Sequence, residues 1–356
     1  MAIRKITVSR DESIYEAWPD VAMTNSGKLI AIFTECEHHL NRDKSRIVLK
    51  ESYDRGETWG EKIYFTERED GGNVRDYSGA LYYNCARIGK LKNGKMYIIC
   101  DRICGNERLD SKVYVWIGNE EGTEWGEPIL IPIVGIVPDK ITELDNGRII
   151  VSAHFGKFSK NKKLVQYLVY SDDGMKTWSK PIVVASHPDM NLCEVSILQH
   201  EGALIAFLRE NSGKGYDVLK TISYDNGETW SPLYNTPMDC GHRPVSGKLK
   251  DGRVMVTYRY IPRGTTNVFA AFLNPDDLLK TERWDQRIRI MPLDYDRNPS
   301  PDLGYTGWVQ FDDGEIFVIN YIKDDADKAF IRGYKFTLDD VELPRNANTS
   351  RNVFNT

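Results

Sequence analysis

Residues that could take part in catalysis recur along this chain at equivalent positions, before and after short turns that separate apolar runs. Histidines at 38, 39, 154 and 242 ionise near neutral pH and could supply general acid–base chemistry. For any one of these residues, a role in a salt bridge or a solvated loop is the simpler explanation. Their recurrence at equivalent positions favours a shared cleft. The residues in this position are Trp18, Asp20, Glu35, Glu37, His38, His39, Arg42, Asp43, Arg87, Asp101, Arg102, Asp139, His154, Glu194, Arg209, Glu210, Asp239, His242, Arg243, Arg259, Arg263, Asp302, Tyr305, Asn320 and Tyr321.

The same residue types lack the spacing of a metal site. Six cysteines occur without paired metal-binding spacing, and Cys100 with Cys104 is a weak signal on its own. No pair of histidines four residues apart and no His-Glu-x-x-His motif is present. We therefore expect no metal and no other cofactor. Cysteines that lie inside apolar runs are expected to be buried, reduced thiols.

Six short turns divide the chain into similar units. Their glycines are Gly27, Gly94, Gly147, Gly202, Gly252 and Gly314, with gaps of 67, 53, 55, 50 and 62 residues. Each turn joins two apolar, strand-like runs, as in a β-hairpin. A unit of about 50 residues that repeats with hairpin signals predicts one blade of a β-propeller per unit.

A second repeat runs in phase with the first. Ser52–Trp59 has the pattern S-x-D-x-G-x-T-W, and related segments occur at 171–178 and 223–230, with a degraded copy at 119–125. A further degraded copy is expected around Trp284. Within each of these segments, called boxes here, the Asp accepts backbone N–H groups and the Gly supplies a positive φ. We interpret the boxes as structural staples between the third and fourth strands of a blade.

Together the repeats predict an all-β protein with a single six-bladed β-propeller domain over residues 1–356. The expected blades are 10–65, 75–130, 131–185, 186–236, 237–292 and 293–345. The remaining segment, 3–9, is expected to form a strand that closes the ring and so removes a sheet edge. In a propeller the innermost strands start near the central axis, so residues just before and within these strands, and in the loops that join blades, are expected to line one face.

Composition limits the partners. The net charge is −5, from 47 basic and 52 acidic residues that are well mixed, so neither nucleic acid nor an anionic membrane is an expected partner. The N-terminus has no apolar segment typical of a signal peptide, and no run is long enough to span a membrane. We expect a soluble, cytoplasmic protein, and the alternative is a trimmed form of an exported protein. The oligomeric state stays open.

The boxes on six predicted blades resemble the sialidase (neuraminidase) superfamily, and the resemblance covers essentially the whole chain. Asn191–Leu198 followed by 203–209 is similar to the stretch with a glutamate and the second arginine of the carboxylate-binding triad. Gly304-Tyr305-Thr306-Gly307-Trp308 is similar to the stretch with the nucleophilic tyrosine. The resemblance implies that Tyr305 is the nucleophile, Glu194 its base and Arg209 a substrate-binding arginine. A Tyr–Glu pair suits an anomeric carbon that bears a carboxylate, because a carboxylate nucleophile would be repelled there.

The chain also departs from the family pattern. Trp18 stands where sialidases have the first arginine of the triad, and the third arginine has no clear equivalent near Arg263. The acid/base aspartate aligns best with Asn41, with Asp43 two residues away, so the acid/base is either Asp43 or a histidine. These replacements predict a sialidase-like frame with an altered pocket. We expect Trp18, Asp20, Arg87, His154, His242, Arg243 and His39 to join Arg209 in binding a carbohydrate substrate.

Three functions are compatible with these residues. The first is an exo-acting glycoside hydrolase that cleaves a terminal sugar, acidic or neutral. It is favoured because Tyr305, Glu194 and Arg209 stand at positions that match the sialidase pattern. The second is a polysaccharide lyase, in which His242 or Tyr305 removes the proton α to a uronate carboxylate while Arg243 neutralises that carboxylate. The third is a non-catalytic propeller that binds glycans or a protein.

Overall fold

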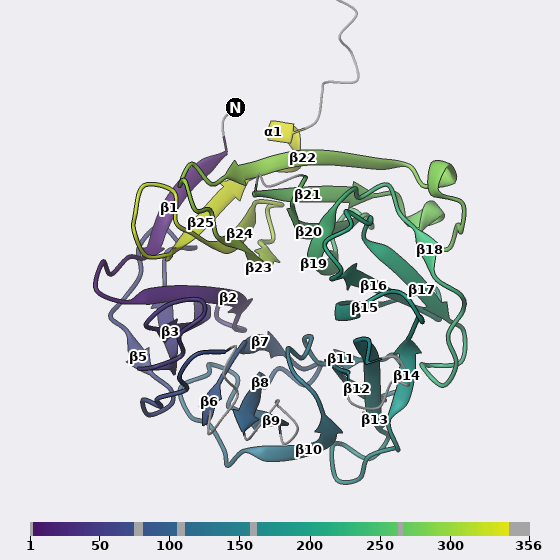
Figure 1. Ribbon diagram of the computed structural model, residues 1–356, viewed down its shortest axis with the longest axis horizontal. Helices are drawn as coiled ribbons and strands as arrows, with labels where there is room; N and C mark the ends of the chain where they lie inside the picture. Colours follow the sequence, from purple (N-terminus) through teal and green to yellow (C-terminus); the bar gives the residue numbers. More distant parts are fainter. Residues whose placement is uncertain (1–2, 75–80, 105–110, 157–161, 263–265, 342–356) are drawn as a thin grey trace, which may run out of the picture.

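The computed structural model describes residues 3–74, 81–104, 111–156, 162–262 and 266–341. These residues form six β-sheets arranged as a ring around a central axis (Figure 1). Five of the sheets contain four strands and one contains five. The all-β class and the six-bladed propeller predicted from the repeats are therefore confirmed.

The strands follow one another around the ring in chain order. Their bounds are β1 (Arg4–Ser9), β2 (Tyr15–Met23), β3 (Leu29–Cys36), β4 (Arg46–Ser52), β5 (Ile63–Tyr64), β6 (Leu81–Tyr83), β7 (Arg87–Lys90), β8 (Met96–Cys104), β9 (Lys112–Ile117), β10 (Ile129–Val134), β11 (Thr142–Glu143), β12 (Ile149–Phe155), β13 (Val165–Ser171), β14 (Ile182–Ala185), β15 (Leu192–His200), β16 (Ala203–Glu210), β17 (Leu219–Ser223), β18 (Tyr234–Asn235), β19 (Gly241–Lys248), β20 (Val254–Tyr260), β21 (Asn267–Leu273), β22 (Ile288–Tyr295), β23 (Leu303–Gln310), β24 (Ile316–Ile322) and β25 (Phe330–Phe336). The described helical segments are the 3-10 turns η2 (Pro275–Asp277) and η3 (Arg283–Asp285) and the short helix α1 (Leu338–Val341).

The ring is closed by the two ends of the chain. β1 pairs antiparallel with β25, with Lys5 opposite Tyr334, and becomes the outer strand of the sheet that contains β23, β24 and β25. One sheet thus contains both the first and the last of the described strands. Opening the ring at this point would require the separation of two strands far apart in sequence.

The apolar runs become strands that are covered on both faces, because each sheet is packed between its two neighbours. Every residue of β3 is buried, whereas both residues of β5, at the outer edge of the same sheet, are exposed. Six apolar clusters fill the spaces between successive sheets; in one, Met255 of the fifth sheet packs with Val318 of the sixth. The cores lie between blades, so adjacent blades are held by hydrophobic burial.

The boxes form tight turns between the third and fourth strands of their sheets. In the first box Ser52 Oγ donates to Asp54 Oδ1 at 2.8 Å, and the N–H of Thr58 donates to the same oxygen at 2.9 Å. The indole N–H of Trp59 then closes the turn onto the carbonyl oxygen of Gly56 at 3.1 Å. The degraded copy expected around Trp284 is not a box, because Trp284 lies in η3 and is 84% exposed.

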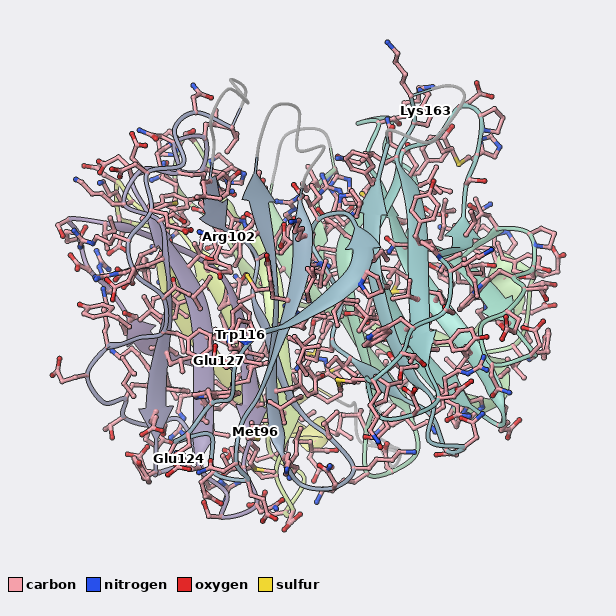
Figure 2. The ribbon with its side chains drawn as sticks, turned by 90° about the horizontal axis from the view of Figure 1, so that it is seen from below. Met96, Arg102, Trp116, Glu124, Glu127 and Lys163 are labelled. Carbon is pink, nitrogen blue, oxygen red and sulfur yellow. The ribbon has the colours of Figure 1, made fainter. Side chains whose placement is uncertain are left out.

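The hairpin turns and the site residues lie at opposite ends of the inner strands. In Figure 2, β8 rises from Met96, at the lower end with Glu124 of the box at 119–125, to Arg102 nearer the upper end. Lys163, which precedes β13, also lies at the upper end. The upper end is therefore where the loops between strands can surround a ligand.

Candidate active site

Bulges in the inner strands set the positions of the candidate residues. The register between the first and second strands shifts between Ala17 and Asp20, between Cys193 and Ser196, between His242 and Val245, and between Leu303 and Thr306. In each shift two residues of the inner strand lie opposite one residue of the second strand, so one extra residue is inserted at the same level of its blade. Bulges of this kind re-aim side chains and are frequent beside active sites.

The first residue of each of these bulges has a positive φ. The angle is 55° at Trp18, 51° at Glu194, 50° at Arg243 and 109° at Gly304. A side chain in this region costs about 1–2 kcal/mol relative to the right-handed region. Three side chains thus carry backbone strain at equivalent places in the ring, and such strain tends to cluster at functional sites.

The glycines of the Gly304-Tyr305-Thr306-Gly307 segment are required by close packing. A Cβ at Gly304 would lie 2.4 Å from the Cβ of Arg259, and a Cβ at Gly307 would lie 1.9 Å from Oδ1 of Asp20. Both distances are far below van der Waals contact. The two glycines therefore allow the strand that carries Tyr305 to approach the blades on either side.

A pocket with a volume of about 220 Å³ lies at this level of the ring. Five blades contribute to its wall, so no single sheet could form it. The lining residues are Trp18, His39, Leu40, Arg42, Val74, Asn84, Cys85, Ile136, Val137, His154, Leu164, Glu194, Asn211 and Tyr305.

Tyr305 and Glu194 meet in this pocket although 111 residues separate them in sequence. The phenol of Tyr305 donates to Oε1 of Glu194 at 2.5 Å, and both residues are buried. Burial, followed by the negative charge of Glu194, raises the pKa of Tyr305 well above its usual value. Burial opposes ionisation of Glu194, but the charges of Arg209 and Arg243 outweigh it and hold the pKa of that carboxyl well below its usual range. In this structure the pair is therefore a neutral phenol hydrogen-bonded to a carboxylate.

Three arginines surround the pair. Nη1 of Arg209 lies 2.9 and 3.0 Å from the two carboxylate oxygens of Glu194. The guanidinium carbons of Arg243 and Arg259 lie 5.2 and 5.8 Å from the centroid of the Tyr305 ring. Among the described residues, Nε of each of these arginines and Nη1 of Arg243 have no hydrogen-bond partner. The site thus contains more buried N–H donors than the described residues satisfy.

A fourth guanidinium reaches the pocket from an unexpected place. Arg42, in the loop after β3, stacks its guanidinium on Trp18 with 3.6 Å between Cζ and the ring centroid. Its Nε and Nη1 are buried without a hydrogen-bond partner in the described residues. Trp18 stands where the resemblance to sialidases implied an arginine, and Arg42 supplies a positive charge beside it. The sequence shows Arg42 among the polar residues of this loop, but the pattern gave it no role.

His39 and Asp302 form a second pair at the pocket. Nδ1 of His39 lies 2.5 Å from Oδ2 of Asp302, and the His39 ring packs edge-on against Trp18 at 5.3 Å. Asp302 also accepts hydrogen bonds from the phenols of Tyr15 and Tyr321. Burial alone would raise the pKa of Asp302, but the hydrogen bond and charge of His39 and the hydrogen bond from Tyr15 hold it at about 2. Asp302 was noted in the sequence as a strand-end acid without a role.

Among the predicted substrate-binding residues, His154 is the third that lines the wall, after Trp18 and His39, and it contacts the backbone of Glu194. The N–H of Glu194 lies 3.4 Å from Nδ1 of His154 and donates to it. This contact makes Nδ1 an acceptor, so in the neutral ring the proton is on Nε2. His154 therefore helps to fix the strained backbone at Glu194.

Asp20 and Arg87, both predicted to bind substrate, do not line the pocket. Both are fully buried, with Arg87 Nε 3.3 Å from Asp20 Oδ2, and Asp20 Oδ2 also accepts the N–H of Ile88 in the next blade at 3.0 Å. Asp139 accepts the N–H of Ile197 in the same way at 2.9 Å. In this structure Asp20 and Arg87 join neighbouring blades, and they have no surface on which to contact a sugar.

Asp43 and His242 are also away from the wall. Asp43 accepts the N–H of Gly72 at 2.9 Å and stabilises the loop that carries Arg42, so it does not face Tyr305 across the pocket. His242 is near Arg209 and Arg259; burial and these two charges lower its pKa to about 3, so its ring is neutral at neutral pH. Arg263, considered for the third arginine, lies outside the described residues.

The comparisons with known proteins agree with this fold. Residues 83–317 match the model of the BNR repeat-like domain family, so the chain belongs to that family. A search of curated protein sequences found no match. The described residues contain no helix that is long and apolar enough to cross a bilayer.

Solved structures with the same fold include several sialidases. A protein of unknown function from Dyadobacter fermentans is 22% identical, with 94% of this chain and 98% of that chain covered and a TM-score of 0.75. The Trypanosoma rangeli sialidase in complex with sialic acid is 15% identical over 94% of this chain and 59% of that chain, with a TM-score of 0.66. The intramolecular trans-sialidase of Ruminococcus gnavus, in complex with oseltamivir carboxylate, is 13% identical over 93% and 96%, with a TM-score of 0.64. The propeller is therefore of the sialidase type.

Proposed function

We propose that this protein is an exo-acting glycoside hydrolase that removes a terminal acidic sugar, with Tyr305 as the nucleophile and Glu194 as its base. The observation that carries the proposal is the 2.5 Å hydrogen bond from Tyr305 to Glu194 at the pocket wall, with Arg209, Arg243 and Arg259 around the pair. A phenol is a weak nucleophile at neutral pH unless a neighbouring group takes its proton. Glu194 is placed to take it.

The arginines support this step electrostatically. As the oxygen of Tyr305 bonds to the anomeric carbon, its proton passes to Glu194 and negative charge leaves the carboxylate. Arg209 and Arg243 are close to both partners, so their charges stabilise the pair throughout the transfer. Charges that are already in place need no reorganisation during the reaction, which is the basis of electrostatic catalysis.

The same arginines favour an anionic substrate. Buried N–H donors without partners cost free energy, and a carboxylate would accept hydrogen bonds from several of them. Arg42 and Arg209 each have a buried Nε without a partner among the described residues. A sugar carboxylate at this place would also repel a carboxylate nucleophile, so a neutral tyrosine is the better one. The sialic acid bound in the Trypanosoma rangeli sialidase is a ligand of this chemical class.

The test is a panel of aryl glycosides of sialic, glucuronic and galacturonic acid, with aryl glucosides and galactosides as neutral counterparts. We expect the wild-type protein to release the aryl group from one acidic glycoside and not from the neutral ones. Tyr305→Phe should abolish release, whereas Tyr224→Phe, a change at an exposed box tyrosine, should retain it. Full activity of Tyr305→Phe would rule out Tyr305 as the nucleophile.

Two other readings give distinct outcomes in the same experiment. Incubation with uronate polysaccharides, followed by ultraviolet absorbance, detects the C=C bonds that a lyase would create. New double bonds without aryl release would replace the hydrolase with a lyase. Neither aryl release nor new double bonds, together with binding on a glycan array, would indicate a non-catalytic binding propeller.

A further inference from the structure

The loop after β3 brings a second proton-transfer group to the pocket. His39 lies on the pocket wall with Trp18 and Tyr305, and its Nδ1 is held by Asp302 at 2.5 Å. Asp302 is in turn fixed by the phenols of Tyr15 and Tyr321. A histidine whose Nδ1–H donates to a carboxylate has a fixed ring orientation and tautomer, with Nε2 available for a second partner.

This cluster is continuous with the nucleophile but separate from it. The Tyr321 ring lies 6.3 Å from the Tyr305 ring and 6.0 Å from the Trp18 ring, and Trp18 contacts His39. The two titratable pairs, Tyr305–Glu194 and His39–Asp302, are thus linked by a layer of aromatic rings. Glycoside cleavage needs two such groups, one that attacks the anomeric carbon and one that protonates the leaving oxygen.

On the basis of the hydrolase function proposed above, we propose that His39 is the general acid and base of this site and that Asp302 is its positioning residue. In the first step, protonated His39 gives its Nε2 proton to the leaving oxygen as the glycosidic C–O bond breaks. Tyr305 forms the new bond to the anomeric carbon and its proton goes to Glu194. The charges and atoms balance with no added reactant.

In the second step the neutral His39 takes a proton from water as the water oxygen bonds to the anomeric carbon. The bond to Tyr305 breaks, and the phenolate recovers its proton from Glu194. His39 ends the cycle protonated, ready for the next substrate. The aspartate that would do this work according to the family resemblance has no counterpart on the wall, since Asp43 is occupied in its own loop.

The experiment compares His39→Asn with His38→Asn on aryl glycosides of the acidic sugar cleaved by the wild type. The aryl groups range from dinitrophenyl, which leaves without protonation, to phenyl, which requires it. His38 is a matched control because it is the neighbouring residue in the same loop, is exposed and does not line the pocket. The quantity measured is kcat/KM, which reports the first irreversible step.

We expect His39→Asn to lower kcat/KM about 10²–10⁴-fold on the phenyl glycoside, the usual contribution of general acid catalysis, and much less on the dinitrophenyl glycoside. His38→Asn should follow the wild type across the series. Asp302→Asn should show the same dependence on leaving group as His39→Asn, and the double variant should lose little more than either single variant.

Equal losses for His39→Asn on all leaving groups would overturn the proposal, as would equal behaviour of His38→Asn and His39→Asn. Wild-type protein that cleaves no acidic aryl glycoside would instead refute the hydrolase function itself. Wild-type activity that disappears in Tyr305→Phe but persists in His39→Asn on the phenyl glycoside would leave the hydrolase standing and remove His39 alone. If Asp302→Asn unfolds, the His39→Asn series still decides the point.

Discussion

Gly304→Ala tests whether close packing behind Tyr305 holds the site together. The added Cβ would lie 2.4 Å from Cβ of Arg259 and 2.6 Å from its Cγ, and the backbone has φ of 109°. The φ alone costs about 1–2 kcal/mol, and forcing an extra methyl into a packed region costs about 1–3 kcal/mol. We therefore expect a loss of about 2–5 kcal/mol in the free energy of unfolding.

Gly314→Ala is the matched control. Gly314 has φ of 91° but no heavy atom within 4 Å of the added Cβ, so only the backbone cost applies. We expect this variant to lose about 1–2 kcal/mol. The difference between the two variants isolates the clash with Arg259.

The assay is urea unfolding of both variants and the wild type, read as the shift in midpoint at constant slope. Gly304→Ala should also lose aryl release, because relief of the clash moves Tyr305 away from Glu194. Variants that agree within about 0.5 kcal/mol, the usual range of neutral surface changes, would refute the packing argument. Full activity of Gly304→Ala would show that the strand can shift without disturbing the pair.

Three further predictions concern the charges of the site. Glu194→Gln removes the base and should lower kcat/KM about 10²–10⁴-fold. Binding of the acidic product should be retained, because the arginines keep their charge. A loss under tenfold in kcat/KM would contradict the assigned role. Arg42→Met should raise KM about 10–100-fold for an acidic aryl glycoside, the worth of a charge-assisted hydrogen bond, and equal affinity in both proteins would exclude a contact with the carboxylate. Asp302 has a folded-state pKa of about 2, below its ordinary value, so it contributes about 2 kcal/mol of stability above pH 4 that is lost as the pH falls through 2. Urea midpoints of the wild type should therefore decline more steeply on acidification than those of Asp302→Asn, and parallel profiles would contradict the assigned pKa.

Much of the fold could be predicted because the signals are local. A turn such as Asn93-Gly94 needs a positive φ, which Gly94 adopts at 86°, and the Ser, Asp and Thr of a box bond within a few residues of one another. Repetition of these signals at a nearly constant spacing implies equal units, and equal units with two strands around each turn imply a ring of blades. The prediction of a degraded box around Trp284 was wrong, because the spacing of residues carries no information on their burial.

The site was predicted only in part, and the reason is again physical. Tyr305, Glu194 and Arg209 lie together as the family resemblance implied. Asp20 and Arg87 looked like ligand-binding residues, yet they pair with each other across a blade boundary and are fully buried, so neither presents a surface to a sugar. A sequence shows that a charge is present but not whether another blade neutralises it.

The sequence by itself determined the number of blades, the strand-turn-strand units and the place in each unit where polar residues gather, because these depend on contacts between near neighbours. The tertiary structure decided which of those residues face the pocket. The bulges at Trp18, Glu194 and Arg243 set the direction of their side chains, and closure of the ring joined His39 to Asp302 across 263 residues. Such pairings depend on the packing of whole blades, and no local pattern encodes them.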